Sequence, residues 1–150
     1  MNKRDRLDMA TEIAHIRMLQ LERARTEALR LARRSDDARA RERRASDALD
    51  AHTDGWRQSL QADPALIPSL MVNWMRASEV AREALTAAST QTRAAQADVD
   101  AYRTTFAMQQ QQVETANDLV VYARRRYKQA CEERQAAAVE DSYLSRRGLR

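Results

Sequence analysis

The sequence has few of the residues that interrupt helices and few of those that fill a globular core. Its 150 residues include two glycines and two prolines, so few positions allow a sharp turn. Aromatic residues make up 5 % of the chain, and only one of them is a phenylalanine. These shortages exclude an ordinary domain with many short elements around a thick core.

Cysteine and long apolar runs are also scarce. Cys131 is the only cysteine, which excludes an intramolecular disulfide and is typical of a reducing compartment. The first residues are charged and do not resemble a secretory signal, and no stretch approaches the roughly 18 apolar residues of a membrane span. Only Lys3 and Lys128 are lysines among 26 basic residues, a bias that we attribute to a GC-rich genome. We therefore expect a cytoplasmic bacterial protein that does not insert in a membrane.

The residues that dominate are strong helix formers with a heptad spacing. In the first third of the chain, steps of three and four connect fifteen positions, eleven of them apolar. These positions are Leu7, Ala10, Ala14, Arg17, Leu21, Ala24, Ala28, Leu31, Ser35, Ala38, Glu42, Ala45, Leu49, His52 and Trp56. The spacing predicts one long helix whose stripe packs on a partner helix.

A second stripe starts after the prolines and continues almost to the end of the chain. Its first part is predicted at Ile67, Leu70, Trp74, Ala77, Ala81, Ala84, Ala88, Gln91 and Ala95. A four-residue step to Val99, where three is due, predicts a stutter that relaxes the supercoil locally. The stripe then continues through Tyr127, Ala130, Ala137 and Leu144.

Together these patterns predict a single all-α domain over residues 1–150, an antiparallel coiled-coil hairpin of two long helices. The first helix is expected over about residues 4–54 and the tip over about 55–67, with a short helical turn at 64–67. The longer second helix is expected over about 68–147. Its last 20 to 25 residues or so should extend beyond the first helix, by the rise per residue. Seam residues such as Tyr127, Ala130, Ala137 and Leu144 would then lack a cover within the chain.

The residues of catalytic and metal sites do not cluster in this sequence. His15 and His52 stand apart on one helix, without the cysteines or carboxylates of a metal site. There is no glycine-rich phosphate loop and no nucleophile elbow. We predict a protein that is not an enzyme and that has no catalytic residues, no cofactor and no metal.

An apolar cluster surrounds the predicted tip and allows two interpretations. The tryptophans can form a small core that closes the turn, or they can anchor a partner. The cluster is too large for a two-helix tip to bury completely, and an exposed apolar patch usually marks an interaction site. The candidate partner-binding residues at the tip are Trp56, Leu60, Leu66, Leu70, Met71 and Trp74.

Near the two ends of the chain there are residues that the heptad stripes do not explain, apolar ones on the first helix and basic ones on the second. Met9, Ile13 and Ile16 form a second apolar edge on the first helix. The densest basic run is ARRRYK, at residues 123–128. An uncovered basic end of this kind predicts a partner.

These features resemble the FliJ/YscO-type stalk proteins of bacterial type III export systems, flagellar or injectisome. The resemblance covers the whole chain and rests on the hairpin with its longer C-terminal helix. The starting residues NKRDRL (2–7) and the charged segment RRRYKQACEERQ (124–135) come nearest to a motif. The resemblance implies a cytoplasmic protein at the cytoplasmic face of a membrane-embedded secretion apparatus.

The resemblance also implies the partners. The end with both termini would enter a hexameric type III export ATPase, the tip would contact an export-gate membrane protein, and export chaperones are further candidate partners. The residues that it assigns to the ATPase end are Met9, Ile13, Ile16, Arg124, Arg125, Arg126, Tyr127 and Lys128.

Two other functions fit the same patterns. A structural scaffold or adaptor would self-associate through its C-terminal helix and form a stable dimer. A nucleic-acid-binding protein would use the arginine runs, but acidic residues interrupt them and no groove-reading motif accompanies them, so no nucleic-acid partner is expected.

Overall fold

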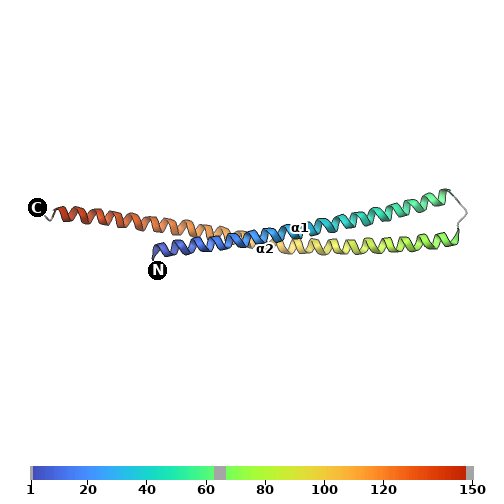
Figure 1. Ribbon diagram of the computed structural model, residues 1–150, viewed down its shortest axis with the longest axis horizontal. Helices are drawn as coiled ribbons and strands as arrows, with labels where there is room; N and C mark the ends of the chain where they lie inside the picture. Colours follow the sequence, from blue (N-terminus) through green and yellow to red (C-terminus); the bar gives the residue numbers. More distant parts are fainter. Residues whose placement is uncertain (1, 63–66, 148–150) are drawn as a thin grey trace. The chain divides into compact units, whose positions relative to one another are not determined.

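The computed structural model describes residues 2–62 and 67–147. They form two helices, α1 (Lys3–Ala62) and α2 (Pro68–Arg147), which pack against each other as a hairpin (Figure 1). The predicted all-α hairpin with the longer helix second is therefore confirmed.

Both helices begin at residues that suit a helix start. The backbone N–H of Asn2 donates to Oδ2 of Asp5 at 3.0 Å, as in a capping box at the start of α1. α2 begins at Pro68, whose fixed φ and missing N–H suit the first helical position. The carbonyl of Ile67 accepts the N–H groups of Leu70 at 3.0 Å and Met71 at 3.2 Å. The predicted bounds of the second helix, 68–147, are confirmed.

The end of the first helix differs from the prediction. α1 continues through Gly55 to Ala62, so the expected end near residue 54 and the tip at 55–67 are wrong for residues 55–62. A glycine inside a helix weakens it by about 1 kcal/mol relative to alanine, but does not have to end it. A Cβ on Gly55 would lie 3.2 Å from Cη2 of Trp74, so the glycine makes room for the indole ring. The expected helical turn at 64–67 falls largely on residues 63–66, outside the described residues.

The chain divides into two compact units, each with a part of both helices. The turn unit is Thr26–Thr104, and the terminal unit consists of Met1–Arg25 and Thr105–Arg150.

In both units the helices run antiparallel and polar side chains connect them across the seam. In the turn unit Arg34 Nη1 lies 3.4 Å from Asp98 Oδ2, and in the terminal unit Arg17 Nη1 donates to Gln112 Oε1 at 2.9 Å. The contacts fix which residues of the two helices face each other.

The seam of α1 agrees with the prediction at every position. All fifteen predicted positions from Leu7 to Trp56 are buried or half-buried. The most buried is Ala38, which is 2 % exposed, and among the described residues no large side chain is completely buried. Small seam residues let the helices approach closely but remove little apolar area from water.

The seam of α2 follows a different set of positions from the predicted one. From Trp74 to Ala130 its buried and half-buried positions follow steps of four and three without a break. The structure uses Ser78, Leu85 and Thr92 where the prediction had Ala77, Ala84 and Gln91, and these last three are exposed. The predicted stutter is therefore wrong. Thr92 tolerates the seam because its hydroxyl donates to the carbonyl of Ala88 at 3.1 Å.

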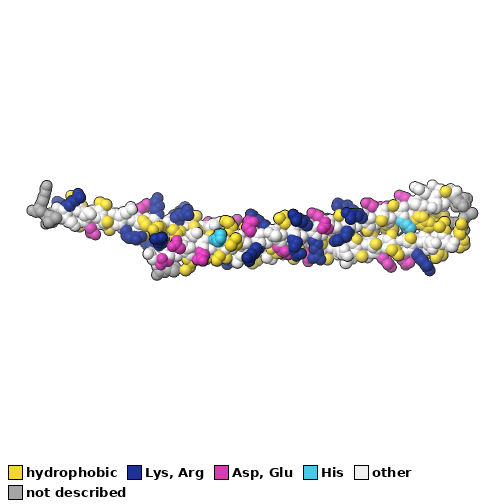
Figure 2. All heavy atoms as spheres, in the orientation of Figure 1, with side chains coloured by type: hydrophobic (Ala, Val, Ile, Leu, Met, Phe, Trp, Pro, Cys, Tyr) yellow, Lys and Arg dark blue, Asp and Glu magenta, His cyan; other side chains and the backbone are white. Residues whose placement is uncertain are grey.

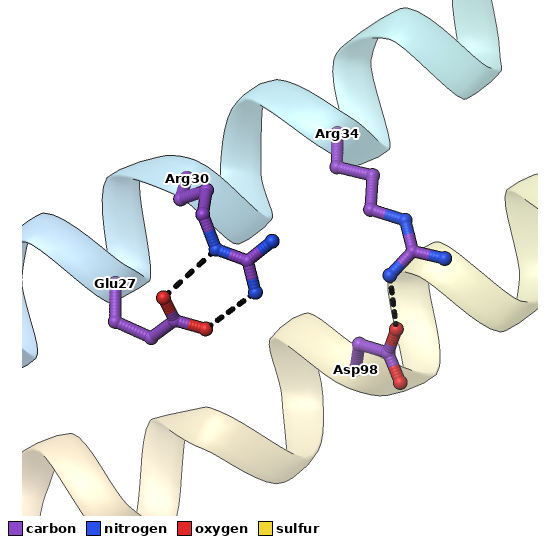
Figure 3. A network of polar contacts seen from close by, with 4 residues as sticks. All are labelled: Glu27, Arg30, Arg34 and Asp98. Carbon is purple, nitrogen blue, oxygen red and sulfur yellow. Dashed lines mark hydrogen bonds and ion pairs between the residues drawn. The ribbon is translucent and has the colours of Figure 1, made fainter.

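Charged residues of both helices line the side of the turn unit (Figure 3). Glu27 and Arg30 form a two-bond pair, with Arg30 donating from Nε at 2.8 Å and from Nη2 at 2.6 Å. The bond from Arg30 holds the pKa of Glu27 below its ordinary value, and the same bond raises the pKa of Arg30. The pair stabilises the helix above the ordinary glutamate pKa, and this contribution is lost as pH falls through the lowered one. Its effect is small, because both groups are in contact with water.

The uncovered end of α2 is shorter than predicted. Tyr127 is half-buried and Ala130 is 7 % exposed, so the expectation that both lack a cover is wrong. All residues from 132 to 147 are exposed, as expected for Ala137 and Leu144. Lys3 Nζ lies 3.9 Å from Glu133 Oε2, so the start of α1 reaches this point of α2 and burial ends there.

The close approach at the alanine seam leads to a prediction about stability. Ala38→Leu should lower the free energy of unfolding by about 1–3 kcal/mol, because the larger side chain has no space between the helices. Ala32→Leu is the matched control, since Ala32 is exposed on the same helix and should change stability by about 0.5 kcal/mol or less. Denaturant unfolding followed by circular dichroism measures both. Equal stability of the two variants would show that the seam is not closely packed.

Candidate functional site

The terminal unit has an apolar hollow between its two helices, which we call the terminal hollow. Its volume is about 300 Å³. It is lined by Lys3, Arg6, Met9, Ala10 and Ile13 of α1 and by Leu119, Tyr122, Ala123 and Arg126 of α2. Both helices therefore contribute apolar side chains to one surface.

The large apolar side chains of the terminal hollow are exposed because they lie beside the seam and not in it. Met9 and Ile13 are 48 % and 40 % exposed, and Leu119 and Tyr122 are 52 % and 59 % exposed. A two-helix hairpin has one buried stripe per helix, so side chains on the flank of that stripe have no third element to cover them. Ile13 and Leu119 also line a neighbouring hollow of about 330 Å³, which extends the apolar surface along the unit.

The charged side chains at the terminal hollow are all basic. Lys3, Arg6 and Arg126 line it, and no described acidic residue does. The Arg126 guanidinium lies over the Tyr122 ring, 5.8 Å from its centroid, a cation–π distance. The surface is suited to a partner segment with apolar side chains between carboxylates.

The structure brings together three of the residues predicted for this end of the chain. Met9, Ile13 and Arg126 line the terminal hollow, and Ile16 is 48 % exposed. Spacing of Met9, Ile13 and Ile16 by four and three places them on one face of α1.

The other four predicted residues of this end lie apart from the terminal hollow. Arg124 and Arg125 are exposed and do not line it. Tyr127 is half-buried in the seam, and Lys128 Nζ lies 3.7 Å from Glu132 Oε1. Within the arginine run, Arg126 alone lines the terminal hollow.

Six lining residues are not among the predicted site residues: Lys3, Arg6, Ala10, Leu119, Tyr122 and Ala123. A signal for two of them was present. Leu119 and Tyr122 each stand one position before a seam residue, Val120 or Ala123, which places them on the flank of α2. Which flank of α2 faces the edge formed by Met9, Ile13 and Ile16 depends on the register of the two helices, and the sequence alone does not give that register.

The turn unit has an aromatic cluster at the end near Gly55. The Trp56 and Trp74 rings lie 5.6 Å apart, and the His52 ring lies 4.3 Å from that of Trp74. His52 Nε2 is 3.3 Å from the Trp74 carbonyl oxygen. Both indoles are half-buried, so they form part of a small core.

The remaining tip residues are divided between core and surface. Leu60 is half-buried, whereas Leu70 and Met71 are 45 % and 36 % exposed. Leu66 lies outside the described residues. Hydrophobic side chains gather around this end of both helices in Figure 2. A hollow of about 350 Å³ there has a mixed lining of Thr53, Trp56, Trp74, Met75, Ser78, Glu79 and Arg82.

The described residues contain no group of three or more His, Cys, Asp or Glu side chains that could hold a metal ion. Within residues 2–62 and 67–147, neither helix is long and apolar enough to cross a membrane. No family model, curated protein or solved structure matches this chain. The terminal hollow and the aromatic end of the turn unit are therefore the two candidate surfaces.

The division of the tip into core and surface leads to a second prediction. Trp74→Ala should lower the free energy of unfolding by roughly 2 kcal/mol, because it removes the ring that contacts His52 and Trp56. Met75→Ala, at the next residue and 68 % exposed, should change it by about 0.5 kcal/mol or less. Thermal unfolding followed by circular dichroism compares the two. If both variants melt like the wild type, Trp74 is a surface residue and not part of a core.

Proposed function

We propose that the chain is a non-enzymatic stalk of a type III export ATPase complex, with its terminal unit inserted in the hexameric ATPase. The observation that carries the proposal is the terminal hollow, an apolar surface made by both helices and bordered by basic residues. The chain resembles the FliJ/YscO-type stalk proteins in its two-helix hairpin and longer second helix.

The physical support comes from what the terminal unit leaves exposed. Burying apolar surface stabilises a complex by roughly 25 cal/mol per Å² removed from water. The exposed apolar area of the terminal hollow stays in contact with water in the free chain, so a partner that covers it would gain this free energy. Its basic border favours carboxylates on the partner and disfavours a basic partner, which gives specificity. The tyrosine–arginine contact in the hollow combines two residue types that are frequent at the centres of protein interfaces.

The tip is the proposed contact with an export-gate membrane protein. Leu70 and Met71 are exposed there, close to the half-buried tryptophans that would hold their surface in place. In this arrangement the protein works at the cytoplasmic face of the secretion apparatus, and export chaperones are a further partner class. The stalk itself carries out no chemical step.

A structural scaffold is the second candidate function. It is favoured by the exposed end of α2, where Val139, Tyr143 and Leu144 are 70 %, 62 % and 58 % exposed. A scaffold that self-associates there would be a tight dimer in dilute solution, whereas a stalk would be largely monomeric. Light scattering over a range of concentrations separates the two.

Substitutions on two different faces of α2 test the ATPase proposal, one inside the terminal hollow and one outside it. Leu119→Asp should weaken binding to the type III export ATPase of the same organism by about tenfold or more, because it places a carboxylate in the apolar contact. Val121→Asp is the control, since Val121 is similarly exposed, at 48 %, but does not line the terminal hollow. Isothermal titration calorimetry with the purified ATPase measures both. Absence of binding by the wild-type chain, or equal loss in both variants, contradicts the proposal.

A further inference from the structure

A row of exposed residues runs along α2 in the terminal unit, beside the seam as far as Glu133 and beyond the end of the seam after it. Its members follow each other at steps of three and four, so they share one face of the helix. We call this row the exposed stripe; it consists of Leu119, Tyr122, Arg126, Gln129, Glu133, Ala137, Glu140 and Leu144. The spacing is that of a helix-packing stripe, yet every member is exposed.

The chain cannot cover the exposed stripe by folding back on itself. α2 is one continuous helix from Pro68 to Arg147, and Tyr122 and Leu144 are about 33 Å apart along it by the rise per residue. α1 packs on the seam positions of α2, and the residues from 132 to 147 are exposed. Figure 1 shows α2 continuing past the start of α1. Within residues 2–62 and 67–147 nothing covers the stripe, so its surface is open to a second chain.

The order of residues makes the exposed stripe complementary to its own reverse. Tyr122 and Leu144 lie at equal distances on either side of Glu133, and so do Arg126 and Glu140. If two stripes run antiparallel with Glu133 at a two-fold axis, Arg126 faces Glu140 of the second copy and Tyr122 faces Leu144 of the second copy. We propose that two copies of this chain pair in this way, through an isologous helix contact.

The charges on the stripe support this register. Arg126 and Glu140 are both exposed, and within residues 2–62 and 67–147 neither has an ion-pair partner, so each is available for the second copy. The two Glu133 carboxylates would meet at the axis, where like charges repel. Lys3 Nζ lies 3.9 Å from Glu133 Oε2 and offsets that repulsion in each copy.

The apolar ends of the stripe fit the same arrangement. Leu144 of the second copy would lie against Tyr122, at the edge of the terminal hollow, where Met9 and Ile13 are exposed. One apolar contact and one ion pair on each side of the axis make a small interface, so the dimer should be weak and depend on concentration. This differs from the tight dimer of a scaffold.

The pairing also has a consequence for the proposed function, although it does not rest on that proposal. Tyr122 and Arg126 belong to both the exposed stripe and the terminal hollow. A dimer would cover the surface that the ATPase is proposed to bind, so a chain bound to the ATPase could not pair. At high concentration the free chain would form a reversible dimer that the ATPase separates, and on dilution it would be monomeric.

A charge exchange tests the contact between Arg126 and Glu140. Arg126→Glu and Glu140→Arg should each raise the dimer dissociation constant about tenfold or more, because each places like charges opposite one another. The double variant restores opposite charges across the interface and should return to within about threefold of the wild type. Sedimentation equilibrium measures all four proteins. A wild-type chain that stays monomeric at every concentration, single variants that pair normally, or a double variant that does not recover would each overturn the proposal.

Cross-linking tests the register. In a Cys131→Ser background, Glu133→Cys places the two thiols at the axis, whereas Glu132→Cys turns the thiol about 100° around the helix. A short bis-maleimide should link the first variant into dimers and leave the second as monomer. Equal cross-linking of both variants, or cross-linking of the second alone, would overturn the arrangement.

Glu140→Arg also separates the dimer from ATPase binding, because Glu140 does not line the terminal hollow. This variant should lose the dimer and bind the ATPase at least as tightly as the wild type does, because pairing no longer competes. Loss of ATPase binding in this variant would overturn the assigned division of the two surfaces. A wild-type chain that pairs but does not bind the ATPase contradicts only the proposed function, and one that binds the ATPase but never pairs contradicts only the dimer.

Discussion

The structure depends on one constraint, that each helix has a single partner and therefore a single buried stripe. Positions at steps of three and four along α1 face matching positions of α2, and the most buried of them are small, such as Ala38 at 2 % and Ala95 at 3 % exposed. Small residues bring the backbones close, and few large side chains could be added without pushing the helices apart. Everything off the seam meets water.

Because of this constraint, apolar residues outside the seam have no element of the hairpin to cover them. In a larger domain, a second apolar edge such as Met9, Ile13 and Ile16 would usually pack on a third element. Here both the edge and its counterpart on α2, at Leu119 and Tyr122, remain exposed. Surplus apolar surface in a protein with so little core is therefore the strongest indication of where partners bind.

The fold could be predicted from the sequence because a heptad pattern has few other solutions, but its details depend on tertiary contacts. The α1 seam was predicted at every position. On α2 the spacing predicts a seam position at Ala77, whereas uninterrupted pairing with α1 uses Ser78. A glycine at residue 55 predicts a helix end, and the sequence alone does not show that Trp74 occupies the space beside it. In both places the observed structure depends on contacts with the other helix, which the local sequence does not show.

The candidate site was also predictable only in part, because some of its residues stand out by type and others are identified only by the register of the two helices. Met9, Ile13 and Arg126 stand out by type in a sequence of this composition, and the structure brings them together. Leu119 and Tyr122 look like ordinary helix residues until the register places them opposite the Met9 edge. The density of basic residues in the run from 124 to 128 was a poorer guide, because consecutive helical residues point in different directions and only one of them can face a given hollow.

The two proposed contacts of the terminal unit follow from this geometry and limit each other. Tyr122 and Arg126 lie where the terminal hollow and the exposed stripe overlap, so the proposed contacts with a second copy and with the ATPase would bury the same surface and exclude each other. Binding to either partner gains free energy from the same apolar area, and only the difference between the two affinities determines which complex forms. A small dimer interface leaves that difference in favour of a larger partner that encloses both helices. A weak dimer would thus protect an apolar surface in the free chain without preventing its use.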